Sequence, residues 1–588
     1  PFTITAAGSY FITGNLTGTT SSAGILVDAD NVAIDLMGFT LQGLPDALDG
    51  IRVLNARNGI TVRNGSVNDW GQEGIDLIHD GNGKGSGVED VYVLGNIGAG
   101  LRANDNALVA RVTARYNGGA GISAGQNAII RESTARENGS TGIAGSFNNV
   151  IENNTAQGNG GNGITSGAGS TVAGNVSRAN TGSGIFANSG SRVTGNTVTT
   201  NGASGIGVQS LSVVRDNTAD ANGYASATAA GISASLGHNR IENNTLTRNN
   251  IGLRATDSDN VVKDNIVKLS TLRNYEFGVR NQLDLLLSEI PETISWPALV
   301  RLAGSLTGRS GTNGIIIASG NVTIDLQGHS LIGVPGSLSG IASAANGLRY
   351  VTVRNGTVNG WGTQGVALSG LSSDATVESL NVQSNGSIGI WVNDRAVVRN
   401  SQAHYNGLGG ISAGENARIE SCIATFNDGI GVFVNRSSQV VDTTSNRNTI
   451  NGFETINGRA MFSRCVAVGN GTNGFELYFG DTIADCTAGL NGQHGVLVGF
   501  NNVVRNSTFE DNNRAGIWVG GHRNRVENNH SVANGVGIHA TAYTNNLIVG
   551  NTCIGNATNF YVVAGNVCQV ITPAKNTTLI DGSSGGVA

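Results

Sequence analysis

A glycine that returns about every 21 residues constrains this chain more than any other feature. The spacing is 21 residues at every step from Gly100 to Gly205, and a second series runs from Gly365 to Gly537, with one step of 24 and then steps of 21 or 22. A unit this short cannot bury an apolar face alone. The repeat therefore predicts that successive units stack on one another and share one core.

The residues that follow each glycine alternate in the manner of a β-strand. Apolar side chains stand one and three positions after it, as in Ile390 and Val392 or Ile517 and Val519. This period of two is typical of a strand with one buried face. A second short apolar run follows in many units, so we expect each unit to form two or three short strands joined by turns. The sequence therefore indicates an all-β parallel β-helix with about 21 residues per coil, each coil rising about 4.8 Å.

Composition excludes two other repetitive folds. The chain has 588 residues, of which 88 are Gly and 6 are Pro. Collagen requires a strict Gly-X-Y period and abundant Pro, and neither is present. A helical solenoid is disfavoured, because each Gly inside a helix costs about 0.5–1 kcal/mol.

An asparagine precedes the glycine by four residues in coil after coil. Its side-chain amide can hydrogen-bond to its own turn and to the next coil. We therefore expect stacked asparagine ladders that hold the turns in register and have no role in chemistry. The asparagines concerned are Asn117, Asn138, Asn159, Asn180, Asn201, Asn385, Asn406, Asn427, Asn448, Asn470, Asn491 and Asn512.

A larger duplication lies over the short repeat. Residues 31–38 match 321–328, and Trp70 matches Trp361, at an offset of 289 to 291 throughout. This predicts two tandem β-helices, at 1–271 and 298–588. The segment 272–297 breaks the pattern, and we interpret it as a linker or an apolar cap.

The opening segment Gly8–Thr17, the segment Val32–Gly38 and the Gly- and Asn-rich coils resemble the right-handed parallel β-helix repeat family of the pectin-lyase-like superfamily. The resemblance implies the fold and an extracytoplasmic setting. Members include polysaccharide lyases, glycoside hydrolases, epimerases, phage tailspikes and adhesins, so the fold alone does not carry a function over. The sequence has neither the Asp-Pro-His signature of mannuronan epimerases nor the paired-Asp motifs of polygalacturonases.

The residue two positions after each glycine is expected to point outward. In the second half this places Glu454 and Glu476 on adjacent coils, about 5 Å apart and facing solvent. Carboxyl groups at this separation suit a retaining glycosidase, and aromatic rings can stack on sugars. Three interpretations stay open, namely a catalytic pair, glycan contact without chemistry, and a passive surface. The residues expected to contact a ligand are Trp391, Phe433, Tyr478, Trp518 and His539.

The matching row of the first half contains Asp76 and Arg102 among mostly small residues and predicts no acid–base pair. Three cysteines, Cys422, Cys465 and Cys486, are expected to be buried. Whether Cys553 and Cys568 form a disulfide stays open.

No metal or cofactor is predicted. Zinc-type Cys/His spacing is absent. Residues 80–85 begin like a calcium loop, but Lys84 stands at a ligand position and Val91 at the twelfth. The histidines of the last third, His494 among them, are expected in solvated turns.

The net charge of −6 argues against a nucleic-acid partner, and no run of 18 apolar residues predicts a membrane span. Because the chain starts at Pro1, we expect a processed mature product or an excerpt. We predict a secreted or cell-surface, non-catalytic structural or adhesive rod whose partners are copies of itself or a polysaccharide. The alternative is a secreted polysaccharide-degrading enzyme that acts through the second half.

Overall fold

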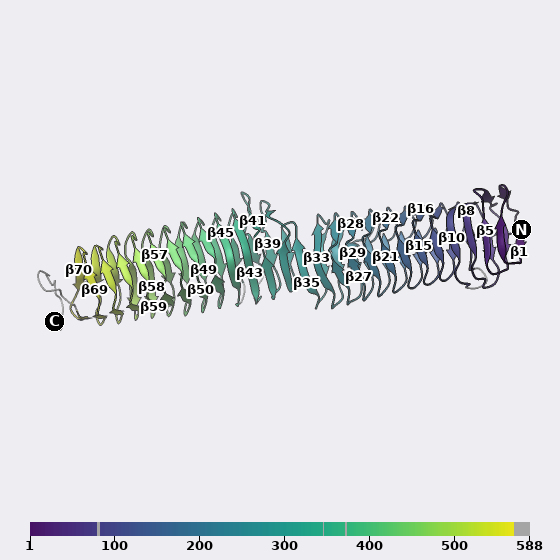
Figure 1. Ribbon diagram of the computed structural model, residues 1–588. Coiled ribbons are helices and arrows are strands. Elements are labelled where there is room, and N and C mark those ends of the chain that lie inside the picture. The colour runs from purple at the N-terminus through teal and green to yellow at the C-terminus, as the bar shows by residue number, and fades with distance from the viewer. Residues whose placement is uncertain (79–82, 345, 371–372, 570–588) are drawn as a thin grey trace. The chain divides into compact units, whose positions relative to one another are not determined.

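The computed structural model describes residues 1–78, 83–344, 346–370 and 373–569. The chain divides into two compact units, Pro1–Leu286 and Leu287–Ala588. Each unit is a stack of short β-strands wound into successive coils (Figure 1). The described residues contain no helix, and hence none long and apolar enough to cross a membrane.

A single coil shows how the 21 residues are used. In the second unit, strand β49 (Gly409–Ala413) is followed by β50 (Arg418–Glu420) and β51 (Ile423–Thr425), and β52 (Ile430–Val434) opens the next coil. Four, two and four residues connect them. Each strand pairs in parallel with its counterpart one coil away. The predicted parallel β-helix is confirmed.

The strands that follow the repeated glycines belong to one 13-stranded sheet in each unit. In the first unit these are β1 (Phe2–Ile4), β4 (Ile25–Val27), β7 (Ile51–Val53), β9 (Ile75–Asp76), β11 (Leu101–Ala103), β14 (Ile122–Ala124), β17 (Ile143–Gly145), β20 (Ile164–Ser166), β23 (Ile185–Ala187), β26 (Ile206–Val208), β29 (Ala230–Ala234), β32 (Ile251–Ala255) and β34 (Arg273–Phe277). In the second they are β36 (Glu292–Ile294), β39 (Ile315–Ile317), β42 (Ile341–Ser343), β44 (Val366–Leu368), β46 (Ile388–Val392), β49, β52, β55 (Phe453–Thr455), β58 (Phe475–Phe479), β61 (Val496–Phe500), β64 (Ala515–Val519), β67 (Val536–Ala540) and β70 (Thr558–Val562).

The division between the units falls inside the segment 272–297. That segment is built from strands, since β34 pairs with β32 in the first unit and β36 pairs with β39 in the second. The duplicated tryptophans, Trp70 and Trp361, are both buried. Each donates its indole N–H to a backbone carbonyl oxygen at 3.2 Å. The two units therefore share the same buried tryptophan and the same indole hydrogen bond.

The core includes the residues one and three positions after each glycine, together with the middle residues of the other short strands, such as Ile419 and Ala424. Ile390, Val392, Ile517 and Val519 expose at most 1% of their surface. Because the strands pair without a shift of register, like side chains stack on like side chains from coil to coil. The inward positions are therefore determined by packing and leave the outward positions free to differ.

The predicted asparagine ladder is present, and Asn159 shows its geometry. Its Nδ2 donates to Oδ1 of Asn180 at 2.8 Å and to the carbonyl oxygen of Ala135 at 3.1 Å. Its own Oδ1 accepts from the backbone N–H and the Nδ2 of Asn138. One buried amide therefore bonds to the coil before it and to the coil after it.

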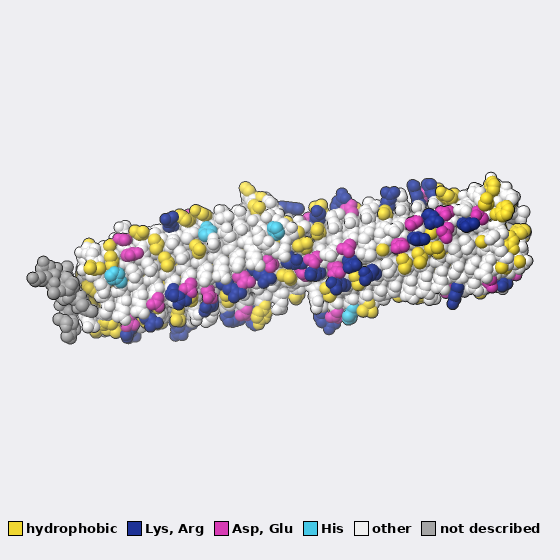
Figure 2. Space-filling model, viewed as in Figure 1, with side chains coloured by type: hydrophobic (Ala, Val, Ile, Leu, Met, Phe, Trp, Pro, Cys, Tyr) yellow, Lys and Arg dark blue, Asp and Glu magenta, His cyan; other side chains and the backbone are white. Residues whose placement is uncertain are grey.

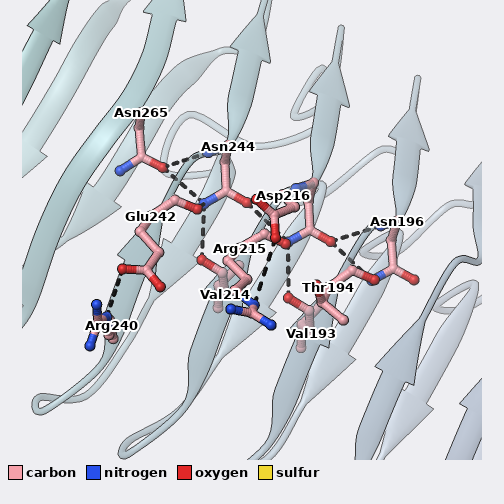
Figure 3. A network of polar contacts seen from close by, with 11 residues as sticks. Val193, Thr194, Asn196, Val214, Arg215, Asp216, Arg240, Glu242, Asn244 and Asn265 are labelled. Atoms are coloured by element: carbon pink, nitrogen blue, oxygen red, sulfur yellow. Dashed lines mark hydrogen bonds and ion pairs between the residues drawn. The ribbon is translucent and has the colours of Figure 1, made fainter.

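A second ladder, not predicted from the sequence, runs through the first unit at another corner of the coil (Figure 3). Asn244 donates from Nδ2 to Oδ1 of Asn265 at 2.8 Å and to the carbonyl oxygen of Val214 at 3.0 Å. This ladder contains Asn154, Asn175, Asn196, Asn217, Asn244 and Asn265.

In the second unit the equivalent corner holds mixed residues, including the three cysteines expected to be buried. Cys422, Cys465 and Cys486 expose at most 2% of their surface. Their thiols also take part in the ladder, since the backbone N–H of Cys465 donates to Sγ of Cys486 at 3.3 Å. Cys553 and Cys568, for which a disulfide stayed open, are not joined by a disulfide in this structure.

Ion pairs join neighbouring coils on the surface. Over each unit Figure 2 shows Lys and Arg side chains next to Asp and Glu. Arg464 lies 2.6 Å from Asp442 on the preceding coil, and Arg395 lies 3.0 Å from Asp374. Such exposed pairs contribute about 0–1 kcal/mol each. The buried amides, rather than these pairs, hold the coils in register.

Removal of one ladder amide tests this conclusion. Asn512→Ala deletes the hydrogen bonds of a buried side-chain amide to Asn491, to Oδ1 of Asn534 and to the carbonyl oxygen of Ala488. Each buried group left without a partner costs about 1–3 kcal/mol, so we expect a loss of roughly 2–5 kcal/mol in denaturant unfolding followed by circular dichroism. Its exposed neighbour is the control, since Asn513→Ala should change little. Equal effects of the two substitutions would contradict the ladder's role.

Candidate functional site

One row of outward side chains crosses the glycine-led sheet of the second unit. We call it the outward row. Strand register places its members one coil apart, and the alternation of side chains along a strand puts them all on the face opposite the core. The row consists of Trp391, Ser412, Phe433, Glu454, Glu476, Leu497, Trp518, His539 and Tyr561.

Glu454 and Glu476 are neighbours in this row, as predicted. The Nδ2 of Asn451 donates to Oε2 of Glu454 at 2.7 Å and to Oε2 of Glu476 at 2.9 Å. Asn473 donates a further hydrogen bond to Oε2 of Glu476 at 3.0 Å. One amide nitrogen therefore holds the two carboxylates together across adjacent coils.

The two carboxylates are more enclosed than the sequence suggested. Both side chains are half-buried rather than fully exposed to solvent. Burial raises the pKa of Glu454 above its ordinary value; the hydrogen bond from Asn451 opposes this rise, and the charge of Glu476 adds to it. The pair can thus accept hydrogen bonds, and Glu454 holds a proton to higher pH than an isolated glutamate does.

Aromatic rings form a stack farther along the row. The ring centroids of Trp518 and His539 lie 4.1 Å apart, and those of His539 and Tyr561 lie 5.0 Å apart. His494, from the coil before Trp518, lies 4.7 Å from the Trp518 ring. The sequence named Trp518 and His539 and missed the other two rings.

The other predicted aromatic residues lie on the same sheet face but apart from this stack. Trp391 exposes 38% of its surface, and Ser412 separates it from Phe433. Phe433 is partly buried beside Glu454. Tyr478 exposes 60% and stands two residues after Glu476 on β58. The predicted residues thus share one face, along which the Glu pair and the ring stack are distinct groups.

His494 does not lie in a solvated turn, and that expectation is wrong. The side chain is buried against Trp518, and its Nδ1 accepts a hydrogen bond from the backbone N–H of Ala515 at 3.2 Å. Burial lowers the pKa of His494 to about 4, with smaller contributions from the charges of Arg514 and His539. The imidazole is therefore neutral at physiological pH.

The first unit holds a carboxylate cluster that sequence reasoning missed. Oxygen atoms of Asp49, Glu73 and Asp76 all lie within 4.8 Å of one another. Asp76 was expected to point into solvent, yet it is fully buried, as is Asp49. Burial raises the pKa of Glu73, and a hydrogen bond with Asp49 and the charges of both aspartates raise it further.

Two arginines offset much of the cluster's negative charge. Arg52 pairs with Asp49, and Arg102 lies 3.1 Å from Asp76. The equivalent residues of the second unit are Ser339, Ala342, Gln364, Ala367 and Trp391, all uncharged. A comparison of the two copies could therefore have revealed the cluster. Of the segment resembling a calcium loop, residues 80–82 lie outside the described residues.

A family model described as "Right handed beta helix region" matches residues 23–177, 339–491 and 480–588. The chain belongs to this family. The predicted relation to right-handed parallel β-helix proteins is thereby confirmed, and the β-helix described above is right-handed.

Solved structures match this chain at low sequence identity and low TM-score. The A-module of the mannuronan C-5 epimerase AlgE4 of Azotobacter vinelandii is 18% identical, with a TM-score of 0.26, over 44% of this chain and 90% of that one. The pectate lyase Pel9A is 18% identical, with a TM-score of 0.24, over 43% and 70%. The tailspike protein of E. coli bacteriophage HK620, in complex with a pentasaccharide, is 12% identical, with a TM-score of 0.12, over 85% and 69%. These likenesses concern the fold alone. No curated protein sequence matches the chain.

Acid should destabilise the protein through His494. The pKa of His494 lies near 4 in the folded chain, against an ordinary histidine value of 6.5. The unfolded chain therefore binds more protons between these pH values, and stability falls as the pH drops. Between pH 7 and pH 5 we expect the wild type to lose roughly 2 kcal/mol relative to His494→Asn. Urea unfolding at both pH values measures this. Equal losses of stability in the wild type and in His494→Asn between pH 7 and pH 5 would contradict the burial of a neutral imidazole.

Proposed function

We propose that this chain is an extracellular, non-catalytic adhesive or structural β-helix that contacts glycans through the outward row of its second unit. The observation that carries the proposal is the ring stack around Trp518 on the outward face of the glycine-led sheet. The extracellular setting rests on the family resemblance. Association with further copies of the chain remains a separate prediction from the sequence.

The duplication supports a binding role for these residues. The first unit builds the same coils with Ser233 and Arg254 where the second has Trp518 and His539. The fold therefore does not require aromatic residues there. Large rings on an exposed face lower solubility and typically mark a binding surface, and rings of this kind can stack on the apolar faces of sugars.

The Glu pair can serve such a surface without chemistry. Carboxylate oxygens accept hydrogen bonds, and sugar hydroxyl groups donate them. Asn451 already holds Glu454 and Glu476 in place, so little side-chain freedom is lost when a ligand binds. The short connections between strands, two to four residues in the coil of β49 to β51, leave the sheet face open to a long polymer.

The second candidate is a glycoside hydrolase that uses the same pair. Two neighbouring carboxyl groups, one with a raised pKa, are what a retaining enzyme needs for its acid and its nucleophile. In that case Glu454 would donate the proton and Glu476 would attack the sugar.

A panel of polysaccharides distinguishes the two candidates. We expect affinity electrophoresis to show retention of the wild type by at least one glycan, a loss of at least tenfold in Trp518→Ala, and no change in Tyr224→Ala, a control with an exposed ring in the first unit. Glu454→Gln/Glu476→Gln should fold and bind more weakly. Release of reducing ends by the wild type, and not by this double variant, would favour the hydrolase. Binding that survives both changes undiminished would contradict the assignment of this face.

A further inference from the structure

We infer that His494 is a ligand-contacting residue of this face, and that its Nε2–H donates a hydrogen bond to an uncharged oxygen of a glycan ring lying over Leu497 and Trp518. The inference rests on the proposed function and adds to it a binding residue and a substrate class.

The hydrogen bond at Nδ1 determines which tautomer the His494 ring adopts. The backbone N–H of Ala515 donates to Nδ1 at 3.2 Å, so Nδ1 supplies its lone pair and carries no proton. A neutral imidazole then has its proton on Nε2. The low pKa of His494, near 4, agrees with a neutral ring.

This Nε2–H has no partner among the described residues. His494 exposes only 3% of its surface, and among the described residues the hydrogen bond of its ring is the one that Nδ1 accepts from the backbone N–H of Ala515. Nε2 is not among the fully buried side-chain nitrogens that lack a hydrogen-bond partner, so this edge of the imidazole reaches the surface. An acceptor brought by a ligand can therefore meet the Nε2–H there.

The coils before His494 indicate where the acceptor would lie. Asn451, Asn473 and His494 occupy the same position, directly before the glycine that opens the strand. Asn473 donates to the outward residue three positions on in its own coil, Glu476. The corresponding residue for His494 is Leu497, which cannot accept a hydrogen bond. Glu476 accepts the hydrogen bond of Asn473, whereas Leu497 offers no acceptor to His494. The Nε2–H of His494 is therefore available to a ligand beside Leu497 and the Trp518 ring.

The surrounding charges favour an uncharged sugar. Glu476 is the neighbour of Leu497 in the outward row, so a uronate carboxylate at this position would meet a like charge. The ring of His539 bonds through Nε2 to Oγ1 of Thr541 at 2.7 Å. Arg514 is exposed in the turn before β64; its charge contributes to the lowered pKa of His494, but solvent screens much of that charge at the surface. A neutral donor next to an aromatic ring and a carboxylate matches a hydroxyl group of a neutral glycan.

The test uses dextran, galactomannan and xyloglucan as neutral probes, and polygalacturonate and alginate as acidic ones. Affinity electrophoresis of the whole chain should show retention by a neutral probe and none by the acidic ones. His494→Phe keeps an aromatic ring beside Trp518 but has no donor, and we expect binding about tenfold weaker. His494→Asn restores an amide of the kind found at Asn473 and should bind within threefold of the wild type.

Leu497→Glu is a second variant in case His494→Phe does not fold. It recreates the arrangement of Asn473 and Glu476, gives Nε2–H an internal acceptor, and should abolish binding while the circular dichroism melting curve is retained. If His494→Phe or Leu497→Glu binds as well as the wild type while Trp518→Ala no longer binds, this inference is overturned. The proposed function would then still stand. Retention by alginate or polygalacturonate that Trp518→Ala abolishes would overturn the substrate class alone. Absence of retention by any probe would overturn both the proposed function and the inference.

Discussion

The buried side-chain amide that bonds to the coils on both sides of it is the interaction on which the structure depends. A β-helix coil of 21 residues has only a few inward apolar side chains, and hydrophobic packing alone does not determine how the turns align. Asn159, with partners on both adjacent coils, removes that freedom. Because such amides recur at the corners, strands of only three residues can stay in register over many coils.

Fixed corners and a packed interior leave the outward face as the variable part of the molecule. The two units use this freedom differently. The first has a buried cluster of acidic and arginine side chains near its start. The second has the Glu454–Glu476 pair and the Trp518 ring stack. Since the coils beneath are alike, these differences are better explained by what each face contacts than by the needs of folding.

Much of this could be predicted from the sequence because local periodicity determined it. The glycine spacing, the inward residues and the first asparagine ladder each follow a fixed period. The second ladder was missed because Cys, Ser and Thr replace Asn in it along the second unit. Tyr405 and Phe426 both adopt positive φ at a corner, which bulky residues rarely do. The ring of His494 packs against that of Trp518, which comes from the next coil. Contacts of this kind depend on the stacked neighbour and carry no periodic signal.

The most direct test exchanges the outward face while the coils are kept. In one variant, Phe433, Glu454 and Trp518 would be replaced by their first-unit counterparts, as Phe433→Ala, Glu454→Thr and Trp518→Ser. The account predicts that thermal melting by circular dichroism stays within a few degrees of the wild type while retention by polysaccharide is lost. Unfolding of this variant, or full retention by it, would contradict the claim that the ladders and core determine the fold while the outward row determines the function.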